Sequence, residues 1–258
     1  MVAHVDPEDG RLIRLSYRVA RASEVWTIPE EPLPESQTHD LILDMLKALL
    51  LAWASKRGAQ VARNLAVRWD EAHPNVGANP DLCVIDPRTP EGDALTSLCL
   101  WKPGHVVPPL VVEVVSDNRP GKDYASAPER YAACGVGELW VFDPLMAGPA
   151  IHGGPVRLQV WTRGESGSFD RVYAGDGPAR SPLLNAWLIA TAEGQRLRIA
   201  DDPDGSRLWL TAEERERAEK ERERAEKERE RAEKERERAE KEQALARLAE
   251  LEAKLRGG

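Results

Sequence analysis

The first segment whose apolar residues recur at helical spacing predicts a long helix. Ser36 or Thr38 can cap its N-terminus, and the helix should run to about Lys56, before Gly58 closes the pattern. Apolar residues occupy most of the circumference of this helix. We therefore expect it to be largely buried.

Short apolar runs further along the chain predict three strands. The segment 61–69 alternates apolar and polar residues, 81–85 is an apolar run opened by an acid, and 110–115 is apolar except for Glu113. Between the second and third strands, 86–107 is predicted to be a long loop. Loops of this length in a compact domain are often functional.

A second helix and a fourth strand follow. Ser126 and Glu129 have the spacing of a capping box, which starts a helix that ends at Gly135. The segment 138–143 is a further strand. The coarse order of elements is therefore helix, strand, strand, strand, helix, strand.

Two hairpins are predicted before residue 211. The segments 158–162 and 169–173 flank a glycine-rich turn, and the segments 196–199 and 207–210 flank Asp-Gly. Trp187 and its apolar neighbours are expected to pack between these two hairpins.

Composition divides the chain into an N-terminal arm (1–37), a folded domain (38–210) and a charged helical tail (211–258). The tail holds 15 of the 36 basic and 16 of the 44 acidic residues. The remainder therefore carries 21 basic and 28 acidic groups, a net charge of −7. This charge argues against non-specific coating of DNA, although it does not exclude a local basic groove.

The tail contains four copies of E-R-E-R-A-E-K, from Glu214 to Lys241, each with one alanine and no second apolar residue. A coiled-coil seam needs apolar residues at both a and d positions. The repeats instead predict a solvated single helix with Glu–Lys pairs four residues apart, each worth ~0.2–0.5 kcal/mol. Only the short stripe Ala244, Leu248, Leu251 and Leu255 has coiled-coil spacing, and it can pair weakly with a second copy or a partner helix.

Neither export nor a membrane span is indicated. The cysteines Cys83, Cys99 and Cys134 are odd in number and irregularly spaced, and there is no signal-type N-terminus. Reduced thiols in a cytoplasmic protein are therefore expected. No stretch approaches the ~20 apolar residues of a transmembrane helix, so we expect no membrane partner.

The position of Glu113 demands a compensating group. An ionised carboxylate in a buried apolar strand costs roughly several kcal/mol unless a cation, a metal or hydrogen bonds compensate it. Asp81 opens another strand, and two carboxylates that converge at strand ends form the usual hard-oxygen site for Mg²⁺. The alternatives are a structural ion pair for Glu113 and a turn or cap role for Asp81.

The motifs between 80 and 144 carry a resemblance to a known family. They are Pro80-Asp81, Val112-Glu113-Val114-Val115-Ser116, Asp123, Tyr131-Ala132, Gly135-Val136 and Glu138-Leu139-Trp140-Val141-Phe142-Asp143-Pro144. With this order of elements the chain resembles the Uma-type putative restriction endonuclease domain family, within the PD-(D/E)XK nuclease superfamily. The resemblance implies an α/β fold, a restriction-endonuclease-like mixed sheet flanked by helices with core order α-β-β-β-α-β, followed here by a long charged C-terminal helix.

The resemblance also implies a metal site. Asp81 and Glu113 would bind Mg²⁺ or Mn²⁺, which polarises the scissile phosphate and lowers the pKa of an attacking water. The superfamily normally has a lysine two residues after the second acid, where this chain has Val115. The Uma-type family usually moves that lysine to the next helix, where this chain has Ala127.

Lys122, in the predicted loop before the second helix, is the nearest cation and is the predicted catalytic lysine. Arg119 and Arg130 are further candidates. Either the lysine has migrated to position 122, or the catalytic site has weakened. Both outcomes stay open.

The other polar residues near these motifs have ordinary explanations. Asp123 is expected to brace the loop, and Tyr131 is expected to pack rather than take part in chemistry. His39 could contribute to the site together with Glu35, although a solvent-exposed pair is the simpler expectation.

The predicted function is a Mg²⁺-dependent endonuclease that hydrolyses DNA phosphodiester bonds, with Asp81, Glu113 and Lys122 as catalytic residues. The alternative is a catalytically weakened nuclease-fold module that binds nucleic acid or a partner. A third candidate is a structural adaptor built around the helical tail.

Overall fold

The computed structural model describes residues 2–5, 12–17, 26–28 and 36–256. Contacts along the chain divide it into two units, Met1–Trp209 and Leu210–Gly258. The first unit contains all the strands and two of the α-helices of the described residues. The second is built on one long helix. The boundaries predicted at residues 37 and 210 stay a prediction.

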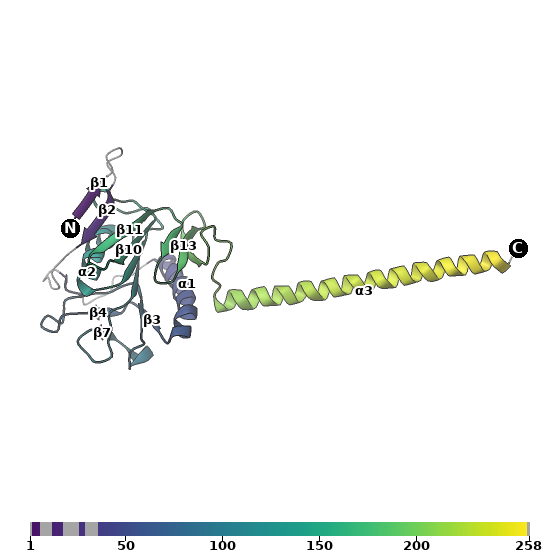
Figure 1. Ribbon diagram of the computed structural model, residues 1–258, viewed down its shortest axis with the longest axis horizontal. Coiled ribbons are helices and arrows are strands. Elements are labelled where there is room, and N and C mark those ends of the chain that lie inside the picture. The colour runs from purple at the N-terminus through teal and green to yellow at the C-terminus, as the bar shows by residue number, and fades with distance from the viewer. Residues whose placement is uncertain (1, 6–11, 18–25, 29–35, 257–258) are drawn as a thin grey trace. The chain divides into compact units, whose positions relative to one another are not determined.

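Eight strands of the first unit form one mixed sheet (Figure 1). Its spatial order is β1 (Val2–Val5), β2 (Leu12–Tyr17), β11 (Phe169–Gly175), β10 (Leu158–Arg163), β9 (Glu138–Phe142), β8 (Leu110–Val114), β6 (Leu82–Ile85) and β3 (Gln60–Arg63). Strands β8 and β9 are parallel, and all other neighbours are antiparallel. The segment interpreted as an N-terminal arm therefore supplies two strands to one end of the sheet.

Smaller elements complete the first unit. Two further sheets have the orders β12 (Ala179–Ser181), β13 (Ala186–Thr191), β14 (Arg196–Ala200) and β5 (Gly77–Ala78), β4 (Ala66–Arg68), β7 (Ser97–Cys99). The α-helices are α1 (Gln37–Ala54) and α2 (Ala127–Cys134). Short helical turns cover Ser55–Arg57, Gly92–Ala94, Lys122–Ser126 and Ala150–His152.

Alternation along the central strands builds two apolar cores, because successive side chains of a strand point to opposite faces. Val111 on β8 belongs to a cluster that includes Tyr131 of α2 and the β5–β4–β7 sheet. Val112 belongs to a second cluster, which includes Leu43 of α1 and the β12–β13–β14 sheet. The large sheet is therefore covered by α2 on one face and by α1 on the other (Figure 1).

The predicted core order is confirmed by α1, β3, β6, β8, α2 and β9. The strand predicted over 61–69 is divided, because Asn64 has a left-handed backbone conformation with φ of 48°. As a result, β3 pairs in the large sheet and β4 in a small one. The predicted loop 86–107 also contributes a strand, β7, which runs parallel to β4.

Helix α1 begins after Ser36, whose Oγ accepts a hydrogen bond from the backbone N–H of His39 at 3.2 Å. Only one face of the helix is buried. Leu41 and Leu51 are 60% and 43% exposed, so the expectation of a largely buried helix was wrong. The helix covers the sheet from one side only, and its opposite side remains in contact with water.

The hairpin of β10 and β11 is confirmed, whereas the second predicted hairpin forms only as a short antiparallel bridge. Strand β14 pairs with β13, which contains Trp187, and 207–210 makes only an isolated bridge between Leu208 and Ala200. The physical reason is burial. Strand β13 places Leu188 in the core, whereas no residue of 207–210 is buried.

Helix α2 does not begin with the predicted capping box. Lys122–Ser126 forms a π-helical turn that continues into α2, so Ser126 already has helical backbone angles and its side chain makes no cap hydrogen bond. At the other end, Gly135 has φ of 96°, a left-handed conformation that closes the helix. Lys122 therefore lies on a helical turn and not in a loop.

The second unit begins with a capping box. The N–H of Glu214 donates to Thr211 Oγ1 at 3.2 Å, and the N–H of Thr211 donates to Glu214 Oε2 at 2.9 Å. Helix α3 then runs over Ala212–Arg256. No helix among the described residues combines the length and the apolar character needed to cross a bilayer.

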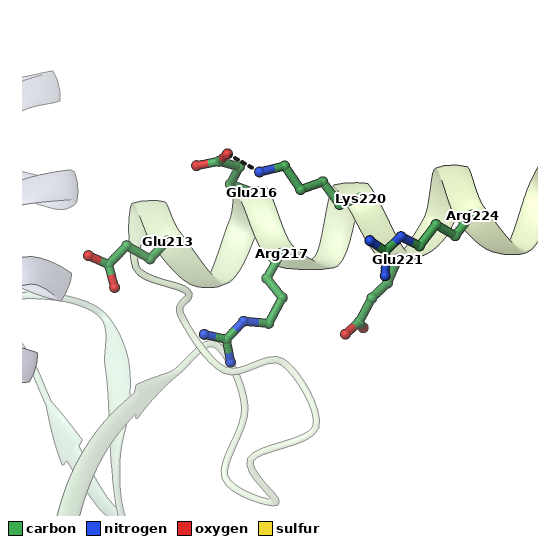
Figure 2. A pocket seen from close by; sticks show the side chains of 6 residues that line it. All are labelled: Glu213, Glu216, Arg217, Lys220, Glu221 and Arg224. Atoms are coloured by element: carbon green, nitrogen blue, oxygen red, sulfur yellow. Dashed lines mark hydrogen bonds and ion pairs between the residues drawn. The ribbon is translucent and has the colours of Figure 1, made fainter.

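The first turns of α3 expose charged side chains. Lys220 Nζ lies 2.5 Å from Glu216 Oε1 (Figure 2). A hollow of about 330 Å³ on this part of the helix is lined only by charged residues, namely Glu213, Glu216, Arg217, Lys220, Glu221 and Arg224 (Figure 2). The side chains of Leu248, Leu251 and Leu255 lie outside the described residues, so their predicted pairing stays a prediction.

Candidate active site

Asp81 and Glu113 lie on the same face of neighbouring strands. The antiparallel partners of β6 and β8 include Leu82 with Val112 and Cys83 with Val111. Continuing this register by one residue sets Asp81 opposite Glu113, and such neighbours have Cβ atoms about 4.5–5.5 Å apart. Both residues are buried, with exposed fractions of 5% and 1%. Their alternation with Val111 places them on the side of the sheet that α2 covers.

The Asp81 carboxylate is held through one oxygen. Its Oδ2 accepts a hydrogen bond from the N–H of Val114 at 2.7 Å. His39 Nε2 lies 3.3 Å from the same oxygen and 3.1 Å from the Val114 carbonyl oxygen. His39 is buried, so the expectation that it faces solvent was wrong. Glu35, its expected partner, lies outside the described residues.

The Glu113 carboxylate contacts two side chains from the segment that covers it. Tyr131 on α2 donates its hydroxyl proton to Glu113 Oε1 in a short hydrogen bond. Lys122 Nζ lies 3.4 Å from Glu113 Oε2. Tyr131 is buried in the apolar cluster, as expected, and also contacts the acid directly.

Lys122 contacts a second acid as well. Its Nζ lies 3.4 Å from Asp123 Oδ1, and the Asp123 side chain is buried whereas that of Lys122 is half exposed. Of the other candidate cations, Arg130 donates to the Gly77 carbonyl oxygen at 3.1 Å. The carbonyl oxygen of Arg119 accepts the N–H of Lys122 at 3.1 Å, within the turn.

The pKa values of this cluster show that its acids outnumber its cation. Burial raises the pKa of Glu113 well above its usual range, Lys122 opposes this shift, and Asp81 and Asp123 add to it. Burial likewise raises the pKa of Asp123 to about 7, against the opposing effect of Lys122. Glu113 raises the pKa of Lys122, with burial acting in the opposite direction. Lys122 therefore keeps its positive charge at neutral pH.

The donor set fits a hard divalent cation. Oxygen ligands and an excess of carboxylates over ammonium groups are what Mg²⁺ and Mn²⁺ prefer. Among the described residues no three histidine, cysteine or acidic side chains converge as a complete metal site. Mg²⁺, however, is usually held by one or two carboxylates, with waters and substrate phosphates at the remaining positions. Asp81 and Glu113 are suited to a site of that kind.

Both usual lysine positions are filled by apolar residues of the core. Val115 and Ala127 are 2% and 3% exposed and belong to the same apolar cluster. The N–H of Val115 also donates to the Phe142 carbonyl oxygen at 2.8 Å, which continues the pairing of β8 with β9. A lysine is brought to Glu113 only from position 122, as far as the described residues show.

His39 is the residue of this cluster that the sequence placed wrongly. Its partners Asp81 and Val114 lie 42 and 75 residues away in the chain. No local pattern encodes contacts of that range. The one local signal is its place at the start of a capped helix, four residues after Glu35, which made a contribution to the site the alternative expectation.

Comparisons with known proteins show the family of the chain. The sequence model of the family described as "Putative restriction endonuclease" (Uma2) matches residues 16–165. No curated protein matches the chain. A solved structure described as a putative nuclease belonging to DUF820, from Anabaena variabilis, is similar over 59% of this chain and 76% of that one, with 15% identity and a TM-score of 0.41. Because the family match extends over more than half of its residues, the chain belongs to the Uma2 family.

Proposed function

We propose that the chain is a divalent-metal-dependent endonuclease that hydrolyses phosphodiester bonds of DNA. Mg²⁺ or Mn²⁺ is the proposed cofactor, with Asp81 and Glu113 as its ligands and Lys122 as the catalytic cation. The observation that carries the proposal is the 3.4 Å contact between Lys122 Nζ and Glu113 Oε2, on the face that also bears Asp81. Membership of the Uma2 family supports the reaction class.

The bound metal would supply a polarised phosphate and an attacking water of lowered pKa. Asp81 and Glu113 would bind it from adjacent strands that are fixed by the sheet. Lys122 would act by charge and not as a general base, because Glu113 raises its pKa and it stays protonated. Its side chain is half exposed, so the ammonium group could contact a bound phosphate as well as Glu113. There it would stabilise negative charge that develops during hydrolysis.

Removing the charge of either acid tests the proposal. Asp81→Asn and Glu113→Gln keep the size of the side chain and remove a metal ligand. Both should abolish Mn²⁺ binding in calorimetry and Mn²⁺-dependent cleavage of plasmid DNA. The matched control is Asp93→Asn, because Asp93 is an exposed acid that pairs with Arg88 away from the site. A wild type that neither binds Mn²⁺ nor cleaves DNA would refute the proposal.

A second candidate is a catalytically weakened module that keeps the fold and binds nucleic acid or a partner. The observation that favours it is the burial of Val115 and Ala127 at both usual lysine positions. Ala127→Lys distinguishes the two candidates. An inactive wild type that gains cleavage through this substitution would show a site that has lost its lysine, whereas an active wild type needs no such repair.

We further propose that residues 38–210, with the two N-terminal strands, form the nuclease domain, and that 211–258 is a separate helical tail. The leucines between Leu248 and Leu255 are the proposed place for weak association with a second copy or a partner helix. We place the protein in the cytoplasm, since its three cysteines are buried thiols outside any disulfide.

A further inference from the structure

We infer that His39 is a positioning residue that fixes Asp81 through one carboxylate oxygen and leaves the other as the metal-binding oxygen. The inference rests on the proposed function and goes beyond it, because it assigns a role to a side chain of α1. Both hydrogen bonds that the described residues make to the Asp81 side chain end on Oδ2. Oδ1 is therefore the oxygen that remains for a cation.

The contacts of His39 define which ring nitrogen carries the proton. A carbonyl oxygen can only accept, so the 3.1 Å contact between Nε2 and the Val114 carbonyl requires a proton on Nε2. The same N–H is shared with Asp81 Oδ2 at 3.3 Å. His39 thus joins the residue that precedes β6 to the residue that follows Glu113 on β8. The sheet sets the register of the two strands, and the imidazole fixes the orientation of the Asp81 carboxylate.

The backbone of His39 is itself held in place. Its N–H donates to Ser36 Oγ in the cap of α1. Arg63 of β3 contacts Asp40, the next residue of α1, at 2.7 Å, and Asp44, about one turn further, at 2.6 Å, which ties the start of α1 to the edge of the sheet. The imidazole therefore projects from a backbone with few alternatives, as a group that orients a ligand must.

Groups that orient metal ligands have measurable effects on affinity. Removing such a partner typically weakens metal binding about 10–100-fold, because the ligand then has to be ordered by the metal itself. His39→Ala should therefore weaken Mn²⁺ binding in calorimetry by about that factor. His39→Gln should bind Mn²⁺ almost as the wild type does, because the glutamine amide nitrogen can donate from nearly the position of Nε2.

Two further variants control the experiment. His73→Gln changes an exposed histidine that pairs with Asp70 on the surface, and it should leave Mn²⁺ binding unchanged. If His39→Ala fails to fold, His39→Asn replaces it, because asparagine has the same amide on a shorter side chain that cannot reach both partners. The comparison of Asn with Gln then carries the test, and circular dichroism establishes that each variant is folded.

A readout without metal separates the inference from the proposed function. In the ¹⁵N spectrum of the metal-free protein, the His39 imidazole should be protonated on Nε2, and Asp81→Asn should shift its signals. The His39→Gln variant identifies these signals by difference. A proton on Nδ1 alone would overturn the inference, whatever the protein does with metal.

The remaining outcomes are equally decisive. If the wild type binds Mn²⁺ and His39→Ala binds it equally well, His39 does not position Asp81 and the proposed function stands. If Gln and Ala weaken binding to the same extent, hydrogen bonding is not the role of His39. If the wild type does not bind Mn²⁺, the proposed function fails and the role of His39 fails with it.

Discussion

Glutamate–lysine pairs occur in both units of the chain, and their surroundings differ. In the first unit Lys122 Nζ lies 3.4 Å from Glu113 Oε2, and the glutamate side chain is 1% exposed. In α3, Lys220 Nζ lies 2.5 Å from Glu216 Oε1, with side chains 67% and 65% exposed. The closer pair is the weaker one, because water and salt screen it. Burial, more than distance, therefore decides how strongly these ion pairs affect stability and pKa values.

The buried pair is also part of a larger imbalance. Asp81, Glu113 and Asp123 face one ammonium group, and the cost of this arrangement appears in the raised pKa values of Glu113 and Asp123. A protein selected only for stability would replace such a cluster by apolar residues. The charges of α3, by contrast, can be exchanged at little cost. Four predictions test this difference, from the largest expected effect to the smallest.

The largest effect should be the pH dependence of stability at Asp123. A carboxyl group whose pKa is raised in the folded state stabilises that state below its unfolded pKa of about 4, and this contribution is lost as the pH rises through about 7. Asp123→Asn removes the titration. In metal-free buffer, the variant should gain stability relative to the wild type between pH 5 and pH 8, by roughly 3 kcal/mol. Urea unfolding at both pH values measures this, and a difference that does not change with pH would contradict the raised pKa.

Lys122→Ala should lower Mn²⁺-dependent cleavage of plasmid DNA by about 10²-fold or more, because a preorganised cation at the phosphate is lost. This corresponds to about 2.7 kcal/mol of transition-state stabilisation. The matched control is Lys220→Ala, which removes a lysine from the exposed pair and should leave cleavage unchanged. Equal cleavage by the wild type and Lys122→Ala would move the role to Arg119 or Arg130.

Tyr131→Phe should lower the free energy of unfolding by about 1–3 kcal/mol, because a buried oxygen of Glu113 loses its donor. Calorimetric or urea unfolding measures the change. In the background of Glu113→Gln the same substitution should cost less, since no carboxylate is then left without its donor. Equal costs in both backgrounds would show that the tyrosine acts through packing alone.

The smallest effects belong to α3. Glu216→Gln should cost only about 0.2–0.5 kcal/mol of helix stability, and less at high salt. Circular dichroism of a Thr211–Gly258 peptide should show helicity that falls with added salt and depends little on peptide concentration. Tight dimerisation that is abolished by changing Ala225 and Ala232 to lysine would instead identify the alanine column as a coiled-coil seam.

The sequence predicted the individual strands better than it predicted how the strands pair. The strand around Glu113 and the strands β9 and β10 could be predicted from the sequence, because the alternation of apolar residues in a strand is a short-range property. The second hairpin is shorter than predicted because no residue of 207–210 is fully buried, although Trp209 packs against the second apolar cluster. Strand β14 pairs mainly with β13, whose apolar residues are buried in the same cluster as those of α1 and β8. That burial depends on segments far away in the chain.

In the candidate site, too, the residues could be predicted from the sequence, whereas several of their contacts could not. Asp81 and Glu113 were predicted from motifs and Lys122 as the nearest cation to them, and the structure brings Lys122 to Glu113. The mode of approach was not predictable, because a π-helical turn over Lys122–Ser126 has no sequence signature. The contact of His39 with Asp81 depends on the packing of α1 against β6 and β8, and no motif spans that interval.

The seven-residue repeat of α3 gives the tail an adjustable length. At a rise of 1.5 Å per residue, its 45 residues extend about 68 Å, comparable to some 20 base pairs of B-form DNA. Gain or loss of one repeat by slippage during replication would change this length by about 10 Å and rotate everything beyond it by only about 20°. Such a change would move the C-terminal end of the helix along its axis while its orientation about that axis stays nearly the same.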